Sequence, residues 1–298
     1  MSSNDKQGWD FHEGDEIVPG RYALKKLGGG SAYEAYIVYD ETMGTIVVAK
    51  MLRPDKAQDE SYLKSLRREA EILGGLSHPV IVRAFDLVDD GERPHLILEH
   101  LEGETLRRLI RFGPVPMEQL LPLALSICSA IHYLAGKEIV HLDIKSRNIV
   151  MGVPPRLIDF SVARTIDRAN RITGHVGTDA YMAPEQCDPG NRGEIGPWTD
   201  VWGLGAALYR AANARVPFPR PKDYDKDDLK QRFPQLDSSP EPFREDLPPM
   251  LAEVILSCLD PEPANRPEAM EVAASLEPLV AVLPRKPVLR KARPGRRY

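Results

Sequence analysis

Near the start of the chain, apolar and polar residues alternate in the manner of β-strands. Residues 21–50 alternate loosely, break at three successive glycines, and end in the β-branched run TIVVAK, whose last residue is Lys50. Two more apolar runs, at residues 80–88 and 94–101, predict two further strands. We therefore expect a β-rich N-terminal unit.

Between these strands the pattern changes to the period of an α-helix. Residues 60–76 repeat apolar side chains every three or four positions, and two glycines near the end of this stretch predict its C-terminus. Glu69 lies at the edge of the apolar face, so its carboxylate can point into the fold. The face itself consists of Leu63, Leu66, Ala70 and Leu73.

From about residue 101 the pattern is mainly helical. A segment rich in proline and charge, residues 217–249, interrupts it, and we expect a long surface excursion with little regular structure there. The helical patterns cover residues 105–113, 117–137, 199–214 and 248–260.

This outline predicts an α+β chain of two lobes. We expect a small β-rich lobe over residues 15–100 with one helix, and a larger, mainly helical lobe over residues 101–280. Residues 1–14 are expected to form a flexible N-terminal segment. Residues 281–298 carry a run of Arg and Lys without acidic residues, which predicts a basic, disordered tail.

Composition and charge change this picture little. The 298 residues include 42% hydrophobic residues and carry a net charge of −5, which suits a globular protein. Cys128, Cys187 and Cys258 are scattered and show no zinc-ligand spacing, so we expect reduced thiols and a cytoplasmic location. The N-terminus lacks the pattern of a signal peptide. The longest apolar stretch, residues 120–135, is shorter than the roughly 20 residues of a membrane span.

The glycine-rich stretch LGGGSAY carries the first chemical signal. Glycines after a strand let backbone N–H groups approach phosphate oxygens closely. Three glycines alone are more often only a tight turn. Lys50, about twenty residues later, ends a buried strand and needs a charged partner there. Glu69 is the natural partner, and such a pair beside the loop can hold the lysine against a nucleotide's phosphates.

The second signal is the stretch HLDIKSRN, residues 141–148. Asp143 can accept a proton from a hydroxyl, Lys145 can neutralise a phosphoryl group, and Asn148 offers a neutral oxygen that suits Mg²⁺. Asp159, in LIDFS, adds a carboxylate after an apolar strand. Magnesium favours one or two carboxylates together with phosphate oxygens, so these residues predict a metal–nucleotide site.

These motifs, in this order, resemble those of protein kinases, and most of all the eukaryotic-like Ser/Thr kinases of bacteria. The resemblance covers roughly residues 20–280. It implies the bilobal protein-kinase fold and transfer of the ATP γ-phosphate to Ser or Thr hydroxyls of proteins, the chain itself included. It also implies that APE, residues 183–185, and Arg266 build a platform for peptide substrates.

The resemblance implies a role for each matching residue. Asp143, Lys145, Lys50 and Glu69 are expected to be catalytic, Asn148 and Asp159 to bind the metal, and Thr178, Glu185 and Arg266 to form the substrate platform. Thr173 is the expected site of autophosphorylation. The expected cofactors are ATP and Mg²⁺, with Mn²⁺ as an alternative. The expected ATP-binding residues are Leu27, Gly28, Gly29, Gly30, Ala35, Val48, Lys50, Glu99, Leu101 and Val150.

Four positions depart from the family pattern. Tyr33 replaces the third glycine of the loop, Ala35 a valine, and Ser161 the glycine of DFG. The fourth is Leu142, which stands where an arginine usually meets a phosphate on the activation loop. Because that arginine is missing, we expect activity that does not depend strongly on phosphorylation of the loop.

Two other readings remain open at this point. The altered motifs also suit a pseudokinase that binds nucleotide or partners without catalysis. A kinase of small molecules is the third alternative, and Thr178, Glu185 and Arg266 speak against it. Pairing of two kinase domains and continuation of the natural chain into a membrane segment are also left open. No nucleic-acid partner is expected.

Overall fold

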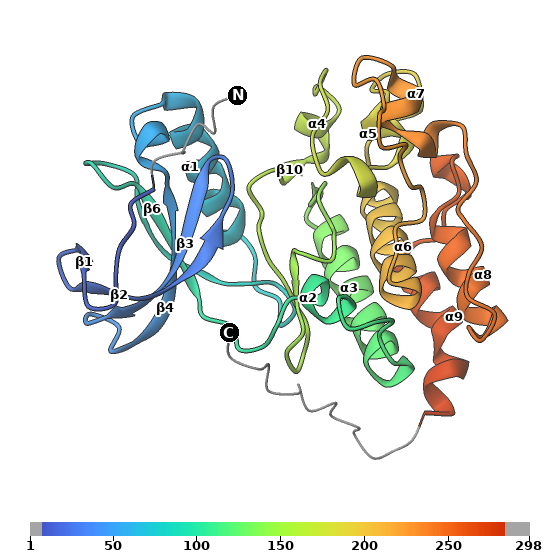
Figure 1. Cartoon of the computed structure of the whole chain (residues 1–298), viewed down its shortest axis with the longest axis horizontal. Coiled ribbons are helices and arrows are strands. Elements are labelled where there is room, and N and C mark those ends of the chain that lie inside the picture. Colours follow the sequence, from blue (N-terminus) through green and yellow to red (C-terminus); the bar gives the residue numbers. More distant parts are fainter. Residues whose placement is uncertain (1–7, 284–298) are drawn as a thin grey trace.

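The computed structural model describes residues 8–283, and these form a sheet-based lobe and a helical lobe (Figure 1). The smaller lobe contains an antiparallel sheet of six described strands, in the order β1-β2-β3-β4-β6-β5. The two-lobe α+β prediction is confirmed. The strands are β1 (Glu16–Val18), β2 (Arg21–Gly29), β3 (Tyr33–Asp40), β4 (Thr45–Leu52), β5 (Ala84–Val88) and β6 (His95–Glu99).

One long helix, α1 (Glu60–Gly74), packs against β5 and β6. Asp59 begins the helix, since its side chain accepts a hydrogen bond from the Ser61 N–H, and Gly75 ends it, as the glycine pair predicts. Leu66, Glu69 and Leu73 are fully buried. The periodic face therefore does what the sequence predicts, and it carries Glu69 into the interior.

The larger lobe is built around α6, which is buried along almost its whole length. Helix α3 packs against α6 and α9, and α8 covers another side of α6 (Figure 1). All four predicted helical stretches are helical in the structure. The helices are α2 (Leu106–Ile110), α3 (Met117–Ala135), α4 (Ile166–Ala169), α5 (Pro184–Cys187), α6 (Pro197–Asn213), α7 (Leu229–Arg232), α8 (Pro249–Cys258) and α9 (Ala269–Ala281).

Two short β-ribbons in this lobe flank the loop of residues 141–148. One ribbon pairs β7 with β10, and the other pairs β8 with β9. The loop therefore leaves one ribbon and enters the other, which fixes both of its ends. The strands are β7 (Ile139–Val140), β8 (Ile149–Val150), β9 (Arg156–Leu157) and β10 (Arg164–Thr165).

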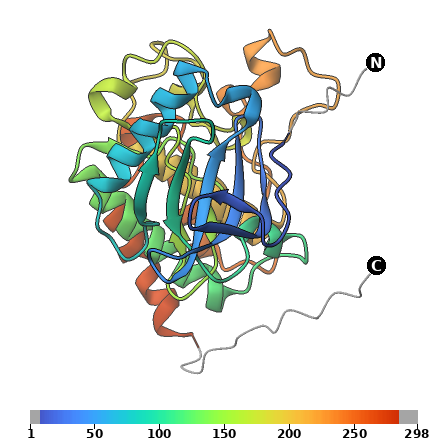
Figure 2. The same cartoon turned by 90° about the vertical axis from the view of Figure 1, so that its left-hand side faces the viewer.

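Figure 2 shows the six-stranded sheet of the smaller lobe from the front, with the helical lobe behind it.

The two ends of the chain are described only in part, from residue 8 and up to residue 283. The basic tail expected over 281–298 lies outside the described residues from residue 284 onward. The flexible segment expected over 1–14 is described from residue 8. There, Trp9 donates its indole N–H to the Leu52 carbonyl at 2.7 Å and packs with Phe11 against the sheet. Those contacts were not part of the expectation. Within the described residues, no helix is long and apolar enough to cross a membrane.

The proline-rich excursion, residues 217–249, contains little regular structure, as predicted, but its side chains make specific contacts. Asp228 caps the short helix α7, and Phe233 packs with Leu236 against the chain near α5. Arg220 and Arg232 both pair with Asp179, at 2.9 and 3.2 Å. The excursion thus buttresses the segment that precedes α5.

A buried ion pair connects α5 to the segment between α8 and α9. Arg266 donates from its two Nη atoms to the two carboxylate oxygens of Glu185, at 2.7 and 2.9 Å, and both side chains are fully buried. Thr199 donates its hydroxyl to the same carboxylate at 2.8 Å. Because both charges are removed from water, either partner alone would be left uncompensated.

We predict that Arg266→Leu lowers the free energy of unfolding by about 3–5 kcal/mol, since it leaves the Glu185 charge buried without its partner. Arg171, which pairs with Asp167 on the surface, is the control. Arg171→Met should change stability by under about 1 kcal/mol. Urea unfolding measures both, and equal losses in the two variants would contradict the prediction.

Candidate active site

The Lys50 ammonium lies at the junction of three segments. Its Nζ donates to both carboxylate oxygens of Glu69, at 2.8 and 2.7 Å, and to Asp159 Oδ1 at 2.7 Å. Strand β4 supplies the lysine, α1 supplies Glu69, and Asp159 follows β9. The Phe160 N–H also donates to Glu69 Oε1, at 3.1 Å. The pair predicted from sequence is therefore present, and it also holds the segment that carries Asp159.

The charges of this cluster shift one another's pKa values: burial and the Asp159 carboxylate raise the pKa of Glu69, although the Lys50 ammonium opposes this rise. Burial lowers the pKa of Lys50, but the Glu69 and Asp159 carboxylates outweigh burial and raise the pKa above its ordinary value. Burial likewise raises the pKa of Asp159, but the nearby Lys50 ammonium outweighs it and holds the pKa well below the usual range. Asp159 is therefore a carboxylate at every pH near neutrality, as a metal ligand must be.

The glycine-rich turn joins β2 to β3 beside this cluster. Gly28 has φ +147°, a region that favours glycine. A Cβ on Gly29 would lie 2.8 Å from the Tyr33 carbonyl, so the two strands approach too closely there for a side chain. The Gly30 N–H donates to the same carbonyl at 2.8 Å. The ring of Tyr33 lies 4.7 Å from Lys50 Nζ, a cation–π contact at the position of the missing third glycine.

The loop of residues 141–148 presents one carboxylate with a shared set of donors. Lys145 Nζ donates to Asp143 Oδ2 at 2.5 Å, and Asn148 Nδ2 donates to the same oxygen at 3.2 Å. Asp143 is buried, and its other oxygen, Oδ1, has no hydrogen-bond partner among the described residues. A buried carboxylate oxygen without a hydrogen-bond donor costs folding free energy. Oδ1 is therefore suited to accept a hydrogen bond from the hydroxyl of a bound molecule.

The backbone of this loop is held by Asp200, near the start of α6. Its two carboxylate oxygens accept the N–H groups of His141 and Leu142 at 2.7 and 2.9 Å. Leu142 has φ +66°, which costs a branched residue about 1 kcal/mol or more. Burial raises the pKa of Asp200, although His141 and the two N–H groups counter it. Asp200 therefore stabilises the strained turn that presents Asp143, and the sequence analysis missed it.

Asp159 and Asn148 offer the oxygen donors that a hard cation takes. The side-chain N–H₂ of Asn148 is used by Asp143, which leaves its oxygen as the ligand atom. The Ile158 N–H donates to the backbone carbonyl of Asn148 at 2.9 Å, and this bond links the loop of Asn148 to the segment of Asp159. No described cluster of three or more His, Cys, Asp or Glu residues makes a metal cage. One carboxylate and one amide fit Mg²⁺ that is shared with phosphates.

The residues expected around adenine come from both lobes. The smaller lobe carries one residue on each of β2, β3 and β4, and Lys50 pairs in register with Ala35. The larger lobe carries Val150 on β8. Glu99 is the last residue of β6, and its carboxylate forms ion pairs with Arg83 and Arg156. The full set is Leu27, Ala35, Val48, Glu99, Leu101 and Val150, with Gly28, Gly29 and Gly30 in the turn.

The substrate-platform residues meet the loop through Thr178. Lys145 Nζ donates to the Thr178 hydroxyl at 2.8 Å, so the lysine joins Asp143 to the platform. Thr178 is half-buried, whereas Thr173 is exposed. Glu185 and Arg266 form the buried pair described above. Asp179, which pairs with the two arginines of the excursion, directly follows Thr178 and was not among the residues predicted from the sequence.

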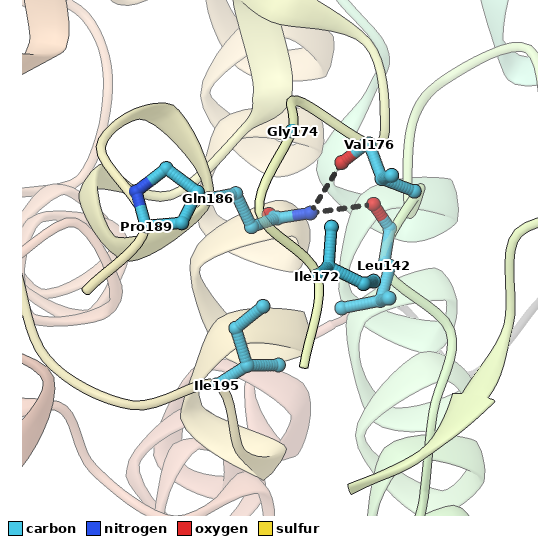
Figure 3. A pocket seen from close by; sticks show the side chains of 7 residues that line it. All are labelled: Leu142, Ile172, Gly174, Val176, Gln186, Pro189 and Ile195. Carbon is cyan, nitrogen blue, oxygen red and sulfur yellow. Dashed lines mark hydrogen bonds between the residues drawn. The ribbon is translucent and has the colours of Figure 1, made fainter. Parts of the chain in front are cut away.

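The position of the missing arginine is filled by an apolar cluster. Leu142 packs with Ile195, and Ile172 and Val176 of the activation segment pack on them. Figure 3 shows Gln186 between two carbonyls: its Nε2 donates to Leu142 O and to Val176 O, both at 2.9 Å. These contacts hold the segment against the loop without a phosphate. The small pocket there is lined by Leu142, Ile172, Gly174, Val176, Gln186, Pro189 and Ile195.

Ser161, the departure in DFS, fits its place without backbone strain. It is absent from the described residues that have positive φ, whereas Asp159 has φ +66°. Arg68 Nη2 donates to the Ser161 carbonyl at 3.3 Å. Phe160 is fully buried and meets the His141 ring edge-on, at 4.6 Å between centroids. This segment is therefore packed against α1 and the catalytic loop together.

Comparison with known proteins agrees with this geometry. Residues 22–276 match the model of the protein kinase domain. A probable serine/threonine-protein kinase of Corynebacterium efficiens is 32% identical over 93% of this chain and 43% of its own length. The serine/threonine-protein kinase PknB of Mycobacterium tuberculosis is 31% identical over 86% of this chain and 42% of its own length. The serine/threonine-protein kinase pkn2 of Myxococcus xanthus is 28% identical over 87% of this chain and 32% of its own length.

The chain thus spans less than half the length of these curated relatives. The matched region nevertheless contains the lysine cluster, the catalytic loop and the buried ion pair. The chain belongs to the protein kinase family, and its relatives are bacterial serine/threonine kinases.

Proposed function

We propose that this chain transfers the γ-phosphate of ATP to Ser or Thr hydroxyls of proteins, itself included. The observation that carries the proposal is the free, buried Oδ1 of Asp143 beside Lys145 and Thr178. An acceptor oxygen next to a fixed ammonium suits a site in which a hydroxyl loses a proton while a phosphoryl group arrives.

In the proposed reaction the substrate hydroxyl oxygen attacks the γ-phosphorus, and the bond from that phosphorus to the β–γ bridging oxygen breaks. The hydroxyl proton passes to Asp143 Oδ1, and ADP leaves with the bonding electrons. Lys145 neutralises charge on the moving group, and Lys50, held by Glu69, binds the α- and β-phosphates. Most of the catalysis is positioning and charge neutralisation.

Mg²⁺ is the metal that we propose for Asp159 and Asn148. Members of the family use ATP with a divalent metal, and a carboxylate with an amide oxygen favours a hard cation. When bound, the metal neutralises phosphate charge. Mn²⁺ takes the same oxygen ligands and stays an alternative.

The pseudokinase reading is disfavoured by the same contacts. Each residue expected to perform the chemistry is present, and the departures at Leu142 and Ser161 have packing partners. We also propose protein rather than small-molecule substrates, since Lys145 bonds Thr178 next to the arginine-braced Asp179. Use of ATP and three free cysteines among the described residues support a cytoplasmic location. Whether two kinase domains pair stays an open question.

The direct test is phosphate transfer from γ-labelled ATP with Mg²⁺ to a generic Ser/Thr substrate. We predict that Asp143→Asn lowers kcat by at least about a hundredfold, because the amide cannot accept the hydroxyl proton. Binding of MgADP should stay within about threefold of the parent, because no phosphate contact is removed. Transfer at the parental rate by the variant would refute Asp143 as the base. No transfer by the parent, with nucleotide still bound, would favour the pseudokinase.

Thr173, which is exposed, is the proposed autophosphorylation site. Because an apolar cluster holds the activation segment, Thr173→Ala should keep kcat/KM within about twofold of the parent. Its neighbour Ile172 packs in that cluster, and Ile172→Asn should lower kcat/KM more than Thr173→Ala does. Initial rates of the parent and both variants, each measured after incubation with MgATP and again after phosphatase treatment, measure both effects. Loss of activity in Thr173→Ala alone would show that a phosphate is required.

A further inference from the structure

A buried carboxylate at the start of β3 lies outside the machinery described above. Glu34 is 1% exposed and directly follows Tyr33. Its Oε1 accepts from Lys26 Nζ at 2.7 Å, and its Oε2 accepts from the Trp9 N–H at 2.9 Å and from the Tyr36 hydroxyl at 3.1 Å. Burial raises the pKa of Glu34, but the Lys26 and Trp9 hydrogen bonds outweigh it, and the pKa lies below the ordinary value. Glu34 is therefore a fully charged and well-paired anchor.

One of these contacts comes from residues 8–11, which we call the strap. Trp9 also donates its indole N–H to the Leu52 carbonyl at 2.7 Å, at the end of β4. Phe11 stacks on Trp9, with centroids 6.0 Å apart, and meets the Tyr36 ring edge-on. The strap thus spans the ends of two strands on one face of the sheet.

Gly8 shows how closely the strap approaches the anchor. A Cβ on Gly8 would lie 2.7 Å from Glu34 Oε1, closer than real Cβ atoms come to an oxygen. Asp10 accepts from Lys26 at 3.4 Å, so the lysine that bonds Glu34 also bonds the strap. The strap therefore packs so closely on the Glu34 carboxylate that there is no room for a side chain at Gly8.

The pleat of β3 connects this face to the nucleotide face. Successive side chains in a strand point to opposite faces, so Tyr33 and Ala35 point away from Glu34. On their face, the Tyr33 ring lies 4.7 Å from Lys50 Nζ. Across the hairpin, Gly29 pairs in register with Glu34. Whatever fixes Glu34 therefore also fixes the glycine-rich turn and the ring over the lysine.

We infer that the strap is a positioning element for the nucleotide: through Glu34 it holds the glycine-rich turn and Tyr33 in place over Lys50. Glu34 and Trp9 are positioning residues, since neither lies on the nucleotide face. The inference rests on the proposed function, because it assumes that the turn binds ATP phosphates. It assigns to residues 8–11 a role that their polar surroundings in the sequence do not indicate.

Glu34→Gln tests the charged anchor, because glutamine keeps the acceptor for Trp9 but loses the ion pairs with Lys26 and Arg53. The exposed Glu41→Gln, on the same lobe, is the control. Calorimetric titration with MgADP should show about three- to tenfold weaker binding for Glu34→Gln and no change for Glu41→Gln. In steady-state kinetics KM for ATP should rise by a similar factor, with KM for a peptide substrate unchanged.

Gly8→Ala tests the strap itself, because the added methyl collides with the anchor. Gly74→Ala is the control, since a Cβ at Gly74 meets nothing within 4 Å. Gly8→Ala should weaken MgADP binding in the same direction as Glu34→Gln, and Gly74→Ala should not. Parental MgADP binding by both Glu34→Gln and Gly8→Ala, even with a lowered melting temperature, would reduce the strap to a structural role and overturn the inference while the proposed function stands. A parent protein that binds no nucleotide would overturn both.

Discussion

The placement of the Lys50 ammonium between two carboxylates is the constraint on which the site depends. One carboxylate comes from α1 and the other from the segment after β9, so a single buried charge aligns the sheet, the helix and the larger lobe. Neither Lys50 nor Glu69 tolerates burial alone, because an isolated buried charge costs several kcal/mol. Their mutual pairing therefore selects one arrangement of the two lobes, and that arrangement brings Asp159 to the catalytic loop.

A second constraint shapes the loop itself. Asp200 satisfies two backbone N–H groups in a turn that Leu142 enters with positive φ, and the leucine side chain then packs against the activation segment. Leu142, which stands where the family pattern has an arginine, is here part of an apolar cluster. We propose that hydrophobic contact, which needs no modification, holds the segment in place of a phosphate bound by an arginine. The contacts that hold the activation segment are thus different from the residues of the loop that are proposed to act in catalysis.

Much of the fold and of the site could be predicted from sequence, because local patterns report local physics. The helical period of residues 60–76 placed Glu69 toward Lys50, and the glycine pair located the end of α1. Contacts between distant segments left no such local signal. Nothing near Trp9 indicates that its N–H binds Glu34, and the composition of the excursion concealed the two arginines that brace Asp179.

The role of Asp200 was also hidden from the sequence. An acidic residue in the first turn of a helix is usually explained by the helix dipole, so its bonds to a loop almost sixty residues away give no separate signal. Ser161 replaces the glycine of the DFG motif, yet the positive φ in that motif lies at Asp159. In each case the outcome depended on tertiary contacts, which override local preference.

The most direct test of this account is the steady-state rate of phosphate transfer by Glu69→Gln, compared with Glu71→Gln on the same helix. Glu69 is buried against Lys50, whereas Glu71 is exposed. The account predicts that Glu69→Gln lowers kcat/KM for ATP by about a hundredfold or more, because Lys50 loses the charge that holds it, and that Glu71→Gln has the parental value. Equal activity in the two variants would contradict the claim that the buried cluster organises the site.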